Sequence, residues 1–227
     1  MAKKKSKKAV VKSKKKVVAK SKSKTVAKKG LWNKLKAEFT TTAIVLIPIA
    51  IGINQVGRLI STALGLPIFL DTIGTVFMAM LAGPWVAGVG GFLTNVVTAI
   101  AYGRATSIFF GVVQLFVGLI AGWFVYNGWL KKLWSVFTTG ALIAVIASLV
   151  SALMVVAVRG GVSGTGVDAV VAFFLASGTG FWTSIVSARI ITEMIDKIIA
   201  VFVPWISIKR LPEKYARLFK YTSKIRD

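Results

Sequence analysis

Residues 135–158 read SVFTTGALIAVIASLVSALMVVAV, 24 residues without one charged side chain. A helix rises about 1.5 Å per residue, so about 20 apolar residues cross the ~30 Å hydrocarbon core of a bilayer. The stretch therefore predicts a transmembrane helix. Five further apolar stretches cover residues 40–60, 66–82, 85–102, 107–128 and 180–205. Together the six stretches predict an all-α polytopic membrane protein, a bundle of six transmembrane helices.

The composition separates apolar from basic residues along the chain. The 227 residues are 56% hydrophobic and 16% charged, with a net charge of +23 and a mean hydropathy of +0.75. Residues 1–36 hold sixteen Lys and no acidic residue. We therefore divide the chain into a Lys-rich tail with a short interfacial helix (1–38), a six-helix transmembrane domain (39–205) and a basic C-terminal tail (206–227).

The distribution of Lys and Arg predicts the orientation. Of the 30 Lys and Arg, 25 lie in 1–38, 129–134 and 206–227, whereas only Arg58, Arg104 and Arg159 lie in or near the opposite loops. Positive residues favour the cytoplasm, so both termini are predicted to be cytoplasmic. The apolar run 169–176 is too short to cross and is expected to be re-entrant or interfacial.

The Lys-rich tail has three interpretations. It is expected to be disordered, because its composition is of low complexity and self-repelling. It is a topology determinant, a contact for anionic lipid at about 1 kcal/mol per Lys, or a weak nucleic-acid binder. Nucleic acid is the least favoured partner, because no aromatic side chains interleave the lysines for base stacking.

The absent residue types restrict the chemistry. The chain has no Cys and no His, which excludes thiol nucleophiles, His general bases and ordinary zinc sites. It has no phosphate-binding G-x-x-x-x-G-K-[ST] sequence. We therefore expect no enzymatic activity, no metal and no cofactor, and instead binding or transport with energy from a partner or a gradient.

Several polar residues share one depth near the outer ends of the predicted spans. Polar side chains in a span usually face the bundle interior, and a few of them in an apolar wall are typical of a small-molecule site. The predicted substrate-binding residues are Asn54, Arg58, Asp71, Asn95, Arg104, Gln114 and Trp182.

Each of these residues also has a structural interpretation. Asp71 can form an ion pair with Arg58 or Arg104, Asn54 and Gln55 can hydrogen-bond between helices, and Trp182 can be an interfacial aromatic.

Charged residues also occur in the last predicted span. Arg189, Glu193 and Lys197 follow one another at i,i+4 spacing, with Asp196 beside them. We expect a self-neutralising ladder of ion pairs, because Glu193 is too deep to stay unpaired. A partner contact or a proton site is the functional alternative.

Small residues recur every fourth position in three predicted spans. Helices in lipid pack closely through such residues. One stripe consists of Gly83, Ala87 and Gly91, and others contain Gly118 and Gly122. A further stripe comprises Gly140, Ala144, Ser148 and Ala152.

Four segments together resemble a known family. They are LPIFLDTIGT (66–75), GPWVAGVGGFLTN (83–95), FGVVQLFVGLIAGW (110–123) and ITEMIDKIIA (191–200). In a small six-span protein without an ATPase motif, they resemble the substrate-binding S component of energy-coupling factor (ECF) type ABC transporters. The resemblance covers residues 40–205.

The resemblance implies a function and partners. Such a protein of the prokaryotic cell membrane binds a vitamin or related micronutrient outside. It docks on a transmembrane coupling protein with two ATPase subunits and topples to deliver its ligand. The family's Ala-x-x-x-Ala pair in the first span is missing, since Ile47 follows Ala43 and Asn54 follows Ala50. The stripe Gly83, Ala87 and Gly91 is the alternative docking surface.

The ligand and two other functions stay open. An anion would suit a free Arg58 or Arg104, an amine would suit a free Asp71, and a neutral ligand would suit a site in which these residues pair. The alternative functions are an ion-gradient-driven secondary transporter, for which no internal repeat is visible, and a membrane anchor that acts through the basic tail.

Overall fold

The computed structural model describes residues 36–226. The chain divides into two units, residues 1–40 and 41–227. In the first unit the described part contains a helical turn at 36–38, and the Lys-rich tail with most of the predicted interfacial helix lies outside the described residues. The other helices of residues 36–226 all belong to the second unit.

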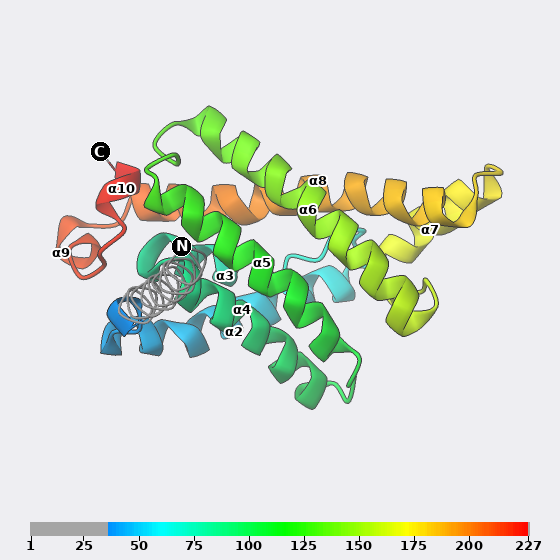
Figure 1. The fold of residues 1–227 in the computed structure, drawn as a ribbon, viewed down its shortest axis with the longest axis horizontal. Coiled ribbons are helices and arrows are strands. Elements are labelled where there is room, and N and C mark those ends of the chain that lie inside the picture. Colours follow the sequence, from blue (N-terminus) through cyan, green and yellow to red (C-terminus); the bar gives the residue numbers. More distant parts are fainter. Residues whose placement is uncertain (1–35, 227) are drawn as a thin grey trace, which may run out of the picture. The chain divides into compact units, whose positions relative to one another are not determined.

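All regular secondary structure in the second unit's described residues is helical (Figure 1). The helices are α2 (Thr41–Ala63), α3 (Ile73–Ala82), α4 (Pro84–Ala101), α5 (Ser107–Tyr126), α6 (Leu133–Arg159), α7 (Val167–Ala176), α8 (Phe181–Lys209), α9 (Glu213–Ala216) and α10 (Ser223–Arg226).

Four of these helices are long and apolar enough to cross a membrane. They are α2, α4, α5 and α6, and they coincide with four of the predicted spans within a few residues. Their outward surface is apolar, since Ile100 is 78% exposed and Leu153 60% exposed. Polar Asn54 is fully buried. The all-α class predicted from the sequence is therefore confirmed for the described residues.

The predicted span 66–82 is only partly helical. Its helix α3 begins at Ile73 and has ten residues, while residues 66–72 form a non-helical connection. Pro67 disfavours helical geometry in its predecessor, and Leu70 has a φ of +53°, which ends regular backbone there. The prediction of one continuous helix over 66–82 is wrong for its first seven residues.

Two helices differ from the candidate spans in length or charge. The run 169–176 lies in α7, a helix of ten residues, in agreement with the prediction that it is too short to cross. The helix α8 has 29 residues, enough by length, but it carries Arg189, Glu193, Asp196 and Lys197 near its middle. All four charged side chains are buried.

Small residues bring the helices of the second unit close together. The most extensive helix pairs are α4 with α5 and α6 with α8. A Cβ atom at Gly118 would lie 2.5 Å from the carbonyl carbon of Ala87, and one at Gly140 would lie 2.8 Å from the Cα atom of Ile198. The predicted stripes therefore mark helix contacts within the chain.

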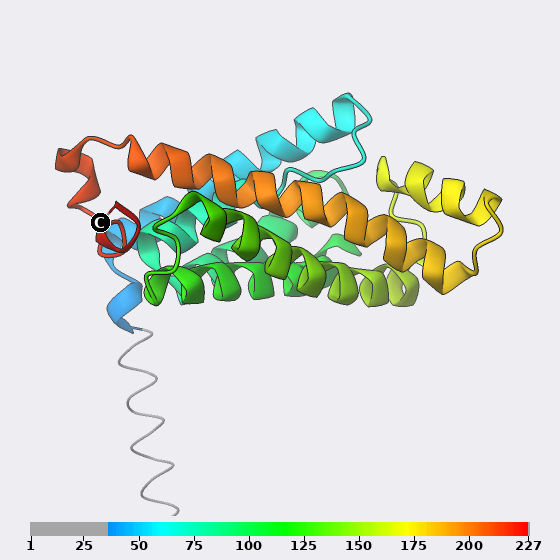
Figure 2. The same cartoon turned by 90° about the horizontal axis from the view of Figure 1, so that it is seen from above.

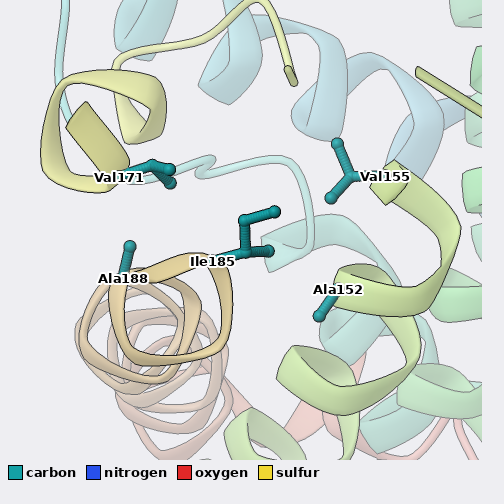
Figure 3. Packing of buried hydrophobic residues seen from close by; sticks show 5 residues of the cluster. All are labelled: Ala152, Val155, Val171, Ile185 and Ala188. Carbon is teal, nitrogen blue, oxygen red and sulfur yellow. The ribbon is translucent and has the colours of Figure 1, made fainter. Parts of the chain in front are cut away.

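An apolar cluster joins α6, α7 and α8. Figure 3 shows Ala152 and Val155 of α6 facing Ile185 and Ala188 of α8, with Val171 of α7 beside them. Val155, Ile185 and Ala188 are completely buried. The cluster holds the short helix α7 against the long helices.

Three connecting segments meet at one end of the second unit. Arg159, at the end of α6, donates a hydrogen bond to Thr106 at 3.0 Å, and Gly166 packs on the carbonyl of Leu66. In Figure 2 the end of α2 and α7 lie at this end, whereas α10 lies at the other. The converging segments are residues 64–72, 102–106 and 160–166.

A glycine substitution tests the packing. Gly118→Ala places a methyl group against the backbone of α4 and is expected to cost about 1–3 kcal/mol, because a packed helix pair must separate. Gly52→Ala in α2 is the matched control, since nothing lies within 4 Å of its Cβ position. Thermal unfolding of the purified protein in detergent measures both. Equal melting temperatures for the two variants would contradict the packing described here.

Candidate functional site

Two neighbouring cavities lie beneath the converging segments. The inner cavity has a volume of about 70 Å³ and the outer cavity about 590 Å³. Their shared wall consists of Arg58, Phe69, Asp71 and Thr165. The inner cavity reaches into the helices, and the outer one lies among the connecting segments.

The inner cavity has a mixed wall of charged, polar and apolar side chains. Besides the shared residues it is lined by Thr72, Asn95, Ser107, Phe110, Val113, Gln114, Val117, Ser151, Arg159, Ser163, Arg189, Glu193 and Lys197. Charged groups at this depth of an apolar bundle are costly, and they usually mark a functional site.

An ion pair stands between the two cavities. Arg58 of α2 donates to the Asp71 carboxylate at 2.5 Å, and both residues line both cavities. The side chains are 22% and 12% exposed. Asp71 thus has a partner within the chain, as the structural interpretation of the sequence proposed.

Asn54 joins three helices and lines neither cavity. Its amide nitrogen donates to Thr75 of α3 at 2.9 Å and to Thr94 of α4 at 3.0 Å, and its oxygen accepts the N–H of Gly74 at 2.7 Å. Gln55 donates to Thr98 at 2.9 Å. Asn54 and Gln55 therefore hydrogen-bond between helices, which was their structural interpretation in the sequence.

Gln114 and Asn95 both line the inner cavity. Gln114 of α5 donates to the backbone carbonyl of Asp71 at 2.8 Å and accepts a hydrogen bond from Thr75 at 3.1 Å. Asn95 of α4 is 2% exposed, and its amide nitrogen has no hydrogen-bond partner in the described part of the chain. Gln114 positions Asp71, whereas Asn95 has a donor left for a ligand.

The remaining two predicted residues, Arg104 and Trp182, do not line the inner cavity. Arg104 lines the outer cavity, close to Gly164. Trp182 lines neither cavity, is 51% exposed and packs edge-on against Phe181, as an interfacial aromatic would. The structure thus brings Arg58, Asp71, Asn95 and Gln114 to the inner cavity.

The charged residues of α8 form a cluster different from the predicted ladder. Lys197 lies 2.9 Å from a Glu193 oxygen and 2.5 Å from an Asp196 oxygen. The predicted Glu193–Lys197 pair is confirmed. The predicted Arg189–Glu193 pair is wrong, because no ion pair joins these two residues. Glu193 turns along the helix towards Lys197 instead.

Asp196 and Lys197 also hold the connection 64–72. Asp196 accepts the backbone N–H groups of Phe69 at 3.0 Å and Leu70 at 2.6 Å, and Lys197 donates to Thr72 at 3.0 Å. These contacts fix the segment that forms the wall between the cavities.

Arg159 was not among the predicted site residues, yet it lines the inner cavity. Its Nε–H donates to Thr106 at 3.0 Å, and its other nitrogens donate to the Ser163 carbonyl at 2.7 Å and to Ser107 at 3.3 Å. Its guanidinium carbon lies 4.9 Å from the ring centre of Phe110. All these partners are uncharged.

Arg189 is the second residue that the sequence prediction missed. It is 3% exposed and lines the inner cavity. Its guanidinium has neither a hydrogen bond nor an ion pair with any residue in the range 36–226. The available signal was its position in an apolar helix, where a charge usually faces the interior.

Asp168 organises the connection after α6. It accepts hydrogen bonds from the Ser163 hydroxyl at 2.6 Å and from the backbone N–H groups of Ser163, Gly164 and Thr165. Burial pushes the pKa of Asp168 upward, but these hydrogen bonds outweigh it, so the net pKa lies below its ordinary value. The carboxylate therefore stays charged at neutral pH.

The stripe predicted as a partner-docking surface lies inside the chain. Gly83, Ala87 and Gly91 are buried, and Ala87 and Gly91 contact the backbone of α5. Ala87 and Gly91 thus belong to the α4–α5 contact, and a partner protein would have to separate these helices to reach them. Among residues 36–226 no three His, Cys, Asp or Glu side chains are placed to hold a metal ion.

No protein-family model matches this chain, and no curated protein matches its sequence.

A substitution at Asn54 tests its assignment as a structural residue. Asn54→Ala leaves the Gly74 N–H buried without an acceptor, so we expect a loss of about 1–3 kcal/mol. Asn127→Ala removes an exposed hydrogen bond to Trp123 and should change stability little. Melting temperatures in detergent compare the two variants, and an unchanged value for Asn54→Ala would show that the network is dispensable.

Proposed function

We propose that the chain is the substrate-binding S component of an ECF-type importer in a prokaryotic cell membrane. It captures a vitamin or related micronutrient from outside and delivers it by toppling when docked on a coupling protein with two ATPase subunits. The observation that carries this proposal is a cavity lined by charged side chains next to a larger outer one, at the end of an apolar helical bundle. Such a cavity suits capture of a small polar molecule.

The proposal includes a six-helix transmembrane bundle. We add α3, together with its preceding connection, and α8 to the four candidate spans. The charges of α8 do not argue against a span, because Arg189, Glu193 and Lys197 turn inward and are each at most 3% exposed. Both termini are then cytoplasmic, and the two cavities open outward, where few Lys and Arg occur.

The two alternative functions are less well supported. A secondary transporter needs carboxylates that can bind a coupling ion, but Glu193 and Asp196 both contact Lys197. A membrane anchor needs no cavity. The basic tail, as a contact for anionic lipid, is compatible with the importer.

The coupling protein is proposed to contact the outer face of α2. Among the four candidate spans α2 is the least buried by the rest of the chain. Ala43 and Ala50 turn inward and are buried, so they cannot form a docking pair. Gly52 lies on the exposed side with open space around it and allows close approach of another helix.

The proposal predicts a specific set of partners. Tagged protein purified from its native membrane should bring along two ATPase subunits and a transmembrane coupling protein, together with a bound small molecule. Mass spectrometry identifies all of them. Uptake driven by an ion gradient in proteoliposomes of the isolated chain, with no ATPase in the purified sample, would overturn the proposal.

The docking face gives a separate prediction. Gly52→Leu should reduce ATPase co-purification at least several-fold, because a large side chain keeps the partner helix away. Ala157→Leu, on the exposed face of α6, is the control and should leave co-purification unchanged. Equal recovery from both variants would exclude this face of α2 as the docking surface.

A further inference from the structure

We propose that the ligand carries an anionic group, a carboxylate or a phosphate, and that this group binds Arg189 and Arg159 in the inner cavity. The inference rests on the proposed function, because it assigns a ligand class to the same site. Its starting point is the unpaired guanidinium of Arg189, which is 3% exposed and lines this cavity.

A buried cation without a partner is unfavourable. Removing a charge from water costs several kcal/mol unless an opposite charge and hydrogen bonds replace the solvent. A guanidinium cannot avoid the cost by losing its proton, because it stays charged in proteins. Glu193 and Asp168 attract Arg189 electrostatically, but no carboxylate of residues 36–226 lies within ion-pair distance of its guanidinium. A ligand anion in the cavity would pair with it directly.

The carboxylates near the cavity are already engaged. Asp71 pairs with Arg58, and Glu193 and Asp196 pair with Lys197. Asp168 lines the outer cavity and is held by Ser163 and its neighbours. Five cations and four carboxylates thus line or support the two cavities, a net charge of +1. One extra negative charge balances the site.

Arg159 presents a second cation to the same cavity. Its hydrogen bonds go to two hydroxyl groups and one carbonyl, so its charge is solvated but not neutralised. These contacts, with the ring of Phe110, hold the guanidinium in a fixed position. A planar carboxylate or a phosphate matches guanidinium donors geometrically.

An unsatisfied donor adds an independent observation. The amide nitrogen of Asn95 is buried at the same cavity without an acceptor in the described part of the chain. A ligand oxygen would satisfy it. The inner cavity of about 70 Å³ has room for about five water molecules, so it suits the charged head of a ligand and a few more atoms. The larger outer cavity of about 590 Å³ is left for the rest of the ligand.

The test compares simple anions on the full-length purified protein. Sodium acetate and sodium phosphate are added at the ionic strength of a sodium chloride reference, and melting temperatures are recorded. An anion at about ten times its dissociation constant should raise the melting temperature by about 3 °C. Stabilisation by acetate alone identifies a carboxylate ligand, and stabilisation by phosphate alone identifies a phosphate. No stabilisation by either anion would overturn the inference.

Two variants connect the effect to the cavity. Arg189→Met should abolish the anion-dependent shift, and it should raise the melting temperature of the ligand-free protein, because an unpaired buried charge is removed. Arg217→Met, at an exposed residue paired with Glu213, should keep the shift. A lower melting temperature of ligand-free Arg189→Met would contradict the inference, since it would show that Arg189 has a structural partner.

The result is independent of the partner experiment. Co-purified ATPases without an anion effect would leave the importer in place and remove the anionic ligand. An anion effect without ATPases would keep the anion site and remove the importer.

Discussion

The contact between Asp196 and the segment 64–72 is the constraint on which the rest of the site depends. One carboxylate of α8 accepts two backbone N–H groups, those of Phe69 and Leu70, which lie 127 and 126 residues away in the chain. Buried N–H groups outside a helix need such acceptors, because leaving them unpaired is costly. The contact allows residues 66–72 to stay non-helical at the edge of an apolar bundle.

The fixed segment determines the shape of the site. It places Asp71 within reach of Arg58 and Gln114, and it puts Thr72 on Lys197. The wall between the inner and outer cavities follows from these contacts. Asp71 is thereby paired with Arg58, and Glu193 and Asp196 are paired with Lys197. Arg159 and Arg189 line the inner cavity without a carboxylate at ion-pair distance. The proposed anionic ligand is based on this uneven pairing.

The sequence predicted the helices better than the site. Long apolar stretches fixed four helices within a few residues, because length and hydrophobicity alone determine them. Pro67 was a local signal against a helix there, but the acceptor that stabilises the non-helical backbone of 66–72 is Asp196, which is distant in the chain. Of the proposed site residues, Asn54 and Trp182 share the depth of the cavities but face elsewhere. Depth can be read from a sequence, whereas the direction of a side chain around its helix depends on its neighbours.

Arg159 and Arg189 were missed as site residues for related reasons. Arg189 was assigned to a ladder because i,i+4 spacing permits a pair with Glu193, but Glu193 bonds to Lys197 instead. Arg159 was counted only as a loop charge. Spacing on one helix identifies possible partners, and competition among several partners in three dimensions selects between them.

The central claim is that the two cavities open to the outside of the cell. Since the chain has no Cys, single cysteines can be placed without background. Thr165→Cys, at the wall shared by the cavities, and Ser207→Cys, near the far end of α8, are treated with a membrane-impermeant maleimide in intact cells. If the cavities open outward, Thr165→Cys is labelled in intact cells and Ser207→Cys only after permeabilisation. The reverse pattern would contradict it.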